Sequence, residues 1–351
     1  MSLTTRPDDT AIVDRDLVDA LEDARGTPAF EFSRIKCVAE QERRNALAAL
    51  GRDKRRRLAA RHIIESEPLS RDDLRHIHSV LAICGLPYRR LPETQREYER
   101  KQGRMALVVE AGKLRSAQTG ERIAQPVPFG PKARLLMMHL CSEAVRQKSP
   151  VIEIADNLTA FMREIGYEPT GGKRGNLPAF KEQLNALAAA RLSIAVWDTK
   201  GGIHERFIQP FSAIEIWMPT NPDERMLWPT KLTFGAEFYE SLTKHALPVN
   251  IHAVRAFSTS ARKLDLYFWL GYRMANLDAS KTISWSALAD QFGSCYESQR
   301  FFRRDFALDL EAICDVLPKL PLKLDETGLA LAPVDPADLA LPAPRRHTSA
   351  R

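Results

Sequence analysis

The clearest pattern of apolar and polar positions lies between residues 170 and 217. Four apolar residues recur there at intervals of three or four, as in a helix with one face against a core: Leu177, Phe180, Leu184 and Leu187. Residues 192–197 then predict a strand, residues 198–202 a turn, and residues 207–217 one or two further strands. The segment therefore predicts a helix followed by a twisted hairpin.

Two more helices are predicted before this one. The first runs from Pro131 to Val145, and the second runs from Asn157 to Ile165 with its apolar side chains on one face. Gly166 follows, where a residue in the left-handed conformation ends a helix. Helices followed by a hairpin indicate a winged helix-turn-helix domain, which we place at residues 105–246. An ordinary small α+β domain, whose last helix only packs against a core, fits the same pattern.

A second copy of this arrangement follows at residues 247–332. A long amphipathic helix that starts near Ser258 or Ser260 includes residues 264–273, and Ser284 and Gly293 delimit a short helix. A third helix extends from Ser298 to about Val316, with its buried stripe at Phe302, Phe306, Leu310 and Ile313. Residues 320–331 predict the closing hairpin. The fold class expected is therefore α+β, mainly α, with two tandem winged helix-turn-helix domains and a helical N-terminal extension.

The remaining segments are predicted from weaker patterns. Residues 1–29 are expected to be mobile, residues 30–104 to form the helical extension, and residues 333–351 to be a disordered tail. Within the extension, residues 70–73 are expected to cap a helix that continues to Cys84 and ends at Gly85.

Two connections near the predicted domain boundaries are also expected. Residues 105–109 predict a strand that pairs with residues 121–126 across a turn at Thr119 and Gly120. Leu247 and Pro248 are expected to be a short interdomain link.

Several short motifs occur together in the order and spacing of a known family. The chain resembles plasmid replication initiators of the RepA family from Gram-negative bacteria, which are related to the TrfA-like group. The resemblance extends from about Leu86 to Pro333, and Phe129 stands where the family often has Tyr. The segments that carry it are residues 85–90, 127–136, 143–145, 160–166, 171–172, 183–184, 264–273 and 283–293.

The resemblance implies a non-enzymatic, cytoplasmic bacterial protein that binds double-stranded DNA in a sequence-specific way. Such a protein recognises direct repeats (iterons) at a plasmid origin, helps to open adjacent DNA and recruits host replication proteins. It also takes part in copy control, and it changes between a homodimer and a DNA-active monomer. A winged-helix transcriptional repressor without a role in initiation is the alternative, and a structural or partition-type adaptor is a third interpretation.

The candidate DNA-binding residues are polar or cationic residues near the start of each predicted recognition helix or on the hairpin. Helix N-termini and cationic side chains are suited to phosphate contacts. In the first domain they are Lys173, Arg174, Asn176, Lys181, Asn185 and, on the hairpin, Lys200. In the second they are Ser298, Gln299, Arg300, Arg303 and Arg304. Simple solvation at the surface is the alternative for each residue.

Composition is consistent with a polyanionic partner. The 351 residues carry a net charge of +6, and 44% of them are hydrophobic, enough for sizeable cores. Runs of basic residues at 43–44 and 52–57 contact DNA phosphates or are solvated helix faces. Five scattered cysteines without metal-ligand spacing, and no long apolar segment, predict a reducing compartment and no cofactor or metal.

A rolling-circle nuclease of the HUH type is the main enzymatic alternative. His76 and His78 could bind a divalent metal, and Tyr98 with Lys101 could supply the nucleophile motif. Two histidines at i and i+2 share a face on a strand but not on a helix, and we place this pair in a helix. No phosphate-binding loop, zinc-protease motif or serine-hydrolase motif occurs.

Overall fold

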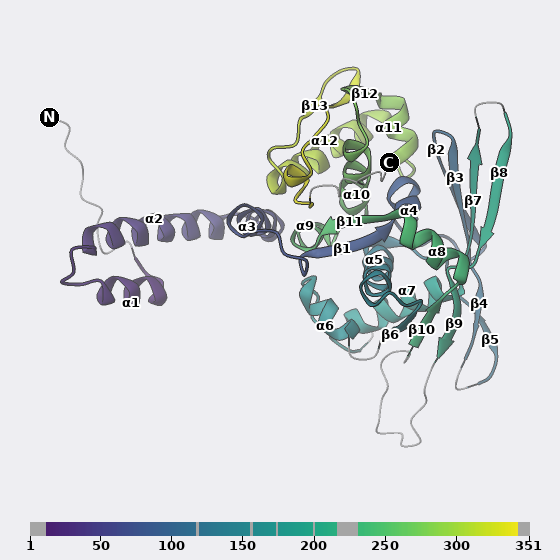
Figure 1. Ribbon diagram of the computed structural model, residues 1–351, viewed down its shortest axis with the longest axis horizontal. Coiled ribbons are helices and arrows are strands. Elements are labelled where there is room, and N and C mark those ends of the chain that lie inside the picture. Colours follow the sequence, from purple (N-terminus) through teal and green to yellow (C-terminus); the bar gives the residue numbers. More distant parts are fainter. Residues whose placement is uncertain are drawn as a thin grey trace, which may run out of the picture. The chain divides into compact units, whose positions relative to one another are not determined.

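The computed structural model combines helices and strands, in agreement with the expected mixed fold class (Figure 1). Contacts divide the chain into one unit that ends at Ala59 and another that begins at Ala60, inside the extension predicted at residues 30–104. Helix α3 (Arg52–Ser66) spans this division. The residues described are 12–116, 119–154, 157–172, 175–198, 201–215 and 231–342.

The first unit contains two paired helices, α1 (Arg15–Asp23) and α2 (Phe30–Ala49). The side chain of Gln41 on α2 accepts two backbone hydrogen bonds at the start of α1, at 2.9 and 2.8 Å. The segment predicted to be mobile therefore includes helix α1, which is hydrogen-bonded to α2. The core that holds α1 is too small to stand out as a sequence pattern, because it consists of Ile12, Leu17, Cys37 and Val38.

The core of the second unit surrounds helix α10 (Ala261–Ala275), which is capped by Ser260, one of the two residues near which the helix was predicted to start. The buried side chains of α10 include Leu264, Leu266, Phe268, Trp269 and Leu270. The helix contacts elements from both halves of the unit: α4 (Ser79–Cys84), α5 (Gly130–Gln147), α9 (Ile251–Phe257) and α12 (Gln299–Val316).

The first module is the segment from α5 to β8, residues 130–208. Its elements follow the predicted order, and Gly166 ends the second helix with a φ of +84°. Phe180 and Leu184 on the third helix are fully buried, as their spacing predicts. After α5 come β6 (Val151–Glu153), α6 (Asn157–Glu164), α7 (Asn176–Ala189), β7 (Arg191–Trp197) and β8 (Ile203–Ile208).

The second module is the segment from α10 to β14, residues 261–331. Ser284 caps its second helix, as predicted, and the stripe from Phe302 to Ile313 is buried. Its strands form a sheet in the order β12-β14-β13, so the strand between the first two helices pairs with the last strand. After α10 come β12 (Lys281–Ser284), α11 (Trp285–Phe292), α12, β13 (Leu322–Leu324) and β14 (Gly328–Leu331).

The hairpin of the first module is part of a four-stranded sheet with the order β2-β3-β7-β8 (Figure 1). Strands β2 (Glu97–Gln102) and β3 (Met105–Glu110) form a hairpin in which Gly103 has a φ of +56°. Residues 105–109 therefore pair with β2 and β7, and the predicted pairing with residues 121–126 was wrong. A tight turn at Gly103 makes the preceding strand the nearest partner.

Four short strands complete the sheets beside the first module. β4 (Lys113–Arg115) pairs with β5 (Arg122–Ala124). β9 (Phe211–Glu215) pairs with β10 (Lys231–Phe234), which also pairs with β6.

The helix predicted up to Cys84 is a strand followed by a short helix. Leu74–His78 forms β1, which pairs antiparallel with β11 (Ala246–Asn250), and only the remainder is helical, as α4. The predicted link at Leu247 and Pro248 therefore lies inside β11. Local spacing suggested a helix, but the pairing partner is far away in sequence, and tertiary pairing overrides local propensity.

Part of the predicted disordered tail packs against the core. Pro336–Leu339 forms a 3₁₀ helix in which Asp335 caps the first turn. Leu339 and Leu341 are buried, and the Asn250 side chain donates a hydrogen bond to the carbonyl of Ala340 at 3.3 Å. Two leucines among prolines provide too little pattern to predict this contact from sequence. Residues 343–351, the rest of the segment predicted to be a disordered tail, lie outside the described residues.

Two buried histidines face the core of the second unit. His78 is 4% exposed and His139 is 6% exposed, and burial lowers the pKa of each imidazole to about 4. Nδ1 of His78 accepts a hydrogen bond from the backbone N–H of Val80, so Nε2 carries the proton. Nε2 then donates to Oγ of Ser241 on α8 (Ala236–His245) at 3.0 Å.

The free energy of unfolding should fall as the pH falls from 6.5 to about 4. In that window the unfolded chain binds protons that the folded chain excludes, and each histidine contributes up to about 3 kcal/mol, which is fully present above pH 6.5. Urea unfolding at several pH values measures the slope, which His139→Phe should reduce. His204→Ala, at an exposed position, is the control. Equal slopes for the wild type and His139→Phe would contradict the prediction.

Candidate nucleic-acid interface

A cationic surface covers the N-terminal half of α12. Gln299, Arg300, Arg303 and Arg304 are exposed, and Ser298 before the helix is half-buried. Arg304 pairs with Asp305 at 2.8 Å, and this hydrogen bond lowers the pKa of the Asp305 carboxyl. Within the described ranges, Arg300 has no ion-pair partner. The five sequence candidates of the second module therefore lie together at the start of one helix.

Aromatic side chains orient two of these arginines. The Arg303 guanidinium lies 5.0 Å from the centre of the Trp285 ring, and that of Arg304 lies 5.4 Å from the centre of the Phe301 ring. Such cation–π contacts stabilise the side chains without neutralising their charge.

Two apolar residues on this surface were missed in the sequence analysis. Phe301 is 54% exposed and Leu308 is 57% exposed. The available signal was position, because Phe301 precedes the buried Phe302 and so lies about 100° away from the buried stripe. Apolar side chains among cations suit a surface that contacts base edges as well as phosphates.

The turn before α12 is held by Tyr296. Its ring packs edge-on against Phe302 at 5.7 Å, and its hydroxyl donates a hydrogen bond to Oδ2 of Asp305 at 3.0 Å. The same hydroxyl accepts a hydrogen bond from Arg262 of α10, which also pairs with Asp309 of α12. The start of α12 is thus fixed relative to α10 before any ligand binds.

Helix α7 carries fewer cations in its described part. Lys181 is exposed and Asn185 is half-buried. The Asn176 side chain donates a hydrogen bond to the carbonyl of Glu168 at 3.0 Å, so it stabilises the turn before the helix. The other three candidates of the first module lie outside the described residues: Lys173, Arg174 and Lys200.

Strand β8 is the edge of its sheet and carries two exposed apolar side chains. Ile203 is 59% exposed and Phe207 is 75% exposed, and residues four apart on a strand share a face. An open edge with apolar side chains is typical of a surface that contacts another chain.

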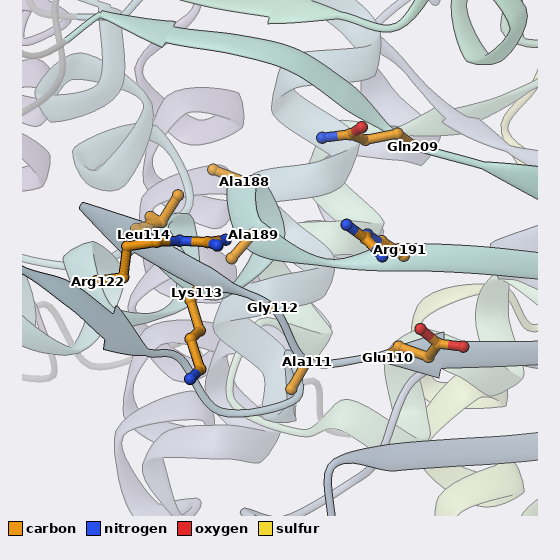
Figure 2. A pocket seen from close by; sticks show the side chains of 10 residues that line it. All are labelled: Glu110, Ala111, Gly112, Lys113, Leu114, Arg122, Ala188, Ala189, Arg191 and Gln209. Atoms are coloured by element: carbon orange, nitrogen blue, oxygen red, sulfur yellow. The ribbon is translucent and has the colours of Figure 1, made fainter.

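A hollow of about 270 Å³ lies at the C-terminal end of α7 (Figure 2). Figure 2 shows the Arg122 side chain extending toward Ala189, with Lys113 and Arg191 also on the lining. The lining includes these three cations and one carboxylate, that of Glu110, so its charge favours an anion. The cations come from three different strands, which is why no local sequence pattern predicted the hollow.

A buried ion pair joins the two modules. Arg134 of α5 and Asp265 of α10 form two hydrogen bonds at 2.5 and 2.7 Å, and their side chains are 2% and 5% exposed. Arg134 also donates to the backbone carbonyls of residues 86, 87 and 130. Because its donors are satisfied, the charge is compensated despite its burial. Gly85 has a φ of +67°, and a Cβ there would lie 2.6 Å from Oδ2 of Asp265.

The two histidines of the nuclease alternative do not lie in a helix, contrary to the prediction. His76 and His78 lie on strand β1, so their side chains do share a face. Both ring nitrogens of His78 are nevertheless used in contacts with Val80 and Ser241. Among the described residues, no group of three or more His, Cys, Asp or Glu side chains is placed to hold a metal ion.

Two further findings concern the cysteines and the helices. The five cysteines are free thiols, of which Cys37, Cys84 and Cys141 are buried. In the part of the chain that is described, no helix has the length and apolar character needed to cross a membrane.

Comparisons with known proteins match part of the chain to a family model. Residues 127–287 match the family described as plasmid encoded RepA protein. The crystal structure of RctB domains 2-3 is similar at 11% identity with a TM-score of 0.42, over 66% of this chain and 82% of that chain. A crystal structure of selenomethionine derivatives of RctB domains 2 and 3 gives 12% identity and a TM-score of 0.43, over 73% and 98%. TM-scores below 0.5 do not establish a shared fold. None of the curated proteins compared matches the chain.

Replacing one partner of the buried pair should strongly destabilise the second unit. Asp265→Asn leaves the Arg134 charge buried without its counter-ion, which costs about 3–5 kcal/mol. Urea unfolding followed by tryptophan fluorescence measures the loss. Glu240→Gln is the matched control, because it breaks an exposed, solvent-screened pair with Lys244 and should leave the free energy of unfolding nearly unchanged. A similar small loss for both variants would show that the pair is not essential.

Proposed function

Since residues 127–287 belong to the family of plasmid-encoded RepA proteins, we propose that this chain is a replication initiator that binds double-stranded DNA sequence-specifically. It binds repeated sites at a plasmid origin, promotes opening of the adjacent DNA and recruits host replication proteins. The observation that carries the DNA-binding proposal is the exposed cationic face of α12.

Each module acts as a winged helix-turn-helix domain in this proposal. Both have the order helix, strand, helix, helix, hairpin. The sheet order β12-β14-β13 of the second module supports the assignment, because the short strand pairs with the far strand of the hairpin as in winged helices. The first module differs, because β6 pairs with β10 instead of with its own hairpin.

Helix α12 enters the major groove with its N-terminal end toward the bases. Arg300, Arg303 and Arg304 then reach guanine edges or phosphates, and Gln299 is suited to adenine. Phe301 supplies an apolar surface for a thymine methyl group. In the first module, Lys181 and Asn185 take the corresponding positions on α7, and we propose that Lys173, Arg174 and Lys200 contribute there as well.

The proposal includes no catalytic step, because the family match and the cationic surface of α12 both support a DNA-binding role. The homodimer, the host partners and the cytoplasmic location stay predictions. A repressor without an initiation role uses the same surfaces, so only a replication assay separates the two functions.

Replacing Arg300 and Arg304 with Ala should weaken binding to a duplex selected from a random pool for tight binding. Loss of even one base contact costs about 1–3 kcal/mol, so Kd should rise at least about fivefold in a gel-shift assay. Stability should change by less than about 1 kcal/mol, because both side chains are exposed. The matched control is the Arg71→Ala, Lys244→Ala double variant, which removes two exposed cations outside both modules.

An unchanged Kd for the double arginine variant would remove α12 from the interface. Initiation is tested by whether the chain alone maintains a plasmid with the selected repeats in a host without another initiator. The proposal is supported if the wild type maintains the plasmid and the Arg300→Ala, Arg304→Ala variant does not. Binding without maintenance favours the repressor.

A further inference from the structure

Arg100 is a buried cation that extends from the first sheet into the second module. It lies on β2 and is 4% exposed. Its Nη1 donates a hydrogen bond to the carbonyl of Gln291 in the last turn of α11. Its Nη2 donates to Oγ of Ser294 at 3.0 Å, and Ser294 lies in the turn between α11 and α12.

Aromatic rings and further hydrogen bonds hold this contact in place, including one from Nη1 of Arg100 to the Tyr88 hydroxyl at 3.3 Å. The Arg100 guanidinium lies 5.1 Å from the centre of the Tyr88 ring and 5.6 Å from that of Tyr98. The side chain of Gln291 in turn donates a hydrogen bond to the carbonyl of Ile83 on α4. A planar guanidinium with fixed donors and two ring contacts has little freedom to reorient.

The contact connects the two DNA-facing parts of the molecule. β2 belongs to the same sheet as the β7–β8 hairpin of the first module, in the order β2-β3-β7-β8. On the other side of Arg100, α12 begins five residues after Ser294. The hairpin is therefore linked to the helix-turn-helix of the second module through hydrogen-bonded strands and one buried side chain.

We propose that Arg100 is a positioning residue that sets the spacing between the two DNA segments that the modules contact. This inference rests on the proposed function. Inserting one base pair moves the second segment by about 3.4 Å and rotates it about the duplex axis, since a turn of about 10 base pairs spans about 34 Å. Two modules held rigidly cannot follow that change, whereas modules joined loosely can.

A purely structural role predicts a different result. If Arg100 only stabilised the fold, its replacement would weaken binding to all spacings by the same factor. A role in spacing changes the ratio of the affinities and leaves binding to the unaltered site nearly intact. The ratio of two Kd values is therefore the decisive readout.

The test uses the full chain and duplexes in which the selected site is lengthened by one or two base pairs between its halves. For the wild type, Kd should rise at least about tenfold on insertion, which is comparable to the effect of a mismatched base pair. Arg100→Lys keeps the charge but lacks the planar guanidinium with its fixed donors. For this variant, Kd should therefore rise by only about threefold or less on insertion. Arg96→Lys is the matched control, because the Arg96 side chain donates to the carbonyls of Ala111 and Gly112, at the end of β3 and outside the second module, and should keep the wild-type ratio.

A DNA-free measurement separates this inference from the proposed function. Spin labels on cysteines introduced at the exposed positions 204 and 311, with Cys295 and Cys314 replaced by Ser, report the distance between the hairpin and α12. Arg100→Lys should broaden that distance distribution, and Arg96→Lys should not. The inference would be overturned if Arg100→Lys and the wild type had the same ratio of Kd values and the same distance distribution. A wild type that binds no selected duplex would contradict the proposed function, and the distance distributions would still decide whether Arg100 fixes the geometry.

Discussion

The buried ion pair between Arg134 and Asp265 is the interaction on which the arrangement of the second unit depends. It joins the first helix of one module to the first helix of the other, and the side chains are only 2% and 5% exposed. Because an unpaired charge at such a site costs several kcal/mol, α5 and α10 cannot slide past each other while the pair is intact. This contact fixes α5 relative to α10, whereas Arg100 links the sheet that contains the β7–β8 hairpin to the turn before α12.

In the proposed function, the two modules present different side chains to DNA. α12 presents arginines and an exposed phenylalanine on a helix whose start is fixed by Tyr296 and Arg262. The described part of α7 presents Lys181, whereas the side chain of Asn176, the first residue of the helix, is hydrogen-bonded to the preceding turn. We therefore expect base recognition to rely more on the second module, with the first module contributing phosphate contacts and orientation.

Local sequence patterns predicted the structural features that depend on residues close together in the chain. Serine caps such as Ser284, the left-handed Gly166 and the buried stripe containing Phe306 were confirmed, because capping, backbone conformation and helical spacing are local properties. The pairing of β1 with β11 was not predictable from local spacing, since its two strands are far apart in the chain. The same holds for the Arg134–Asp265 pair, whose residues are 131 positions apart. Of the candidate site, the second-module residues could be placed from sequence, whereas Phe301, Leu308 and the contacts that position α12 required the structure.

Hydrogen–deuterium exchange with and without the selected duplex tests the central claim most directly. If the two helices face DNA, backbone amides at residues 298–304 and 176–185 should exchange more slowly in the complex, because phosphate and base contacts cover them. Amides of α8, which lies outside both modules, should exchange at the same rate in both states. Slower exchange confined to segments other than α12 and α7 would contradict the assignment of these helices as the DNA-binding surface.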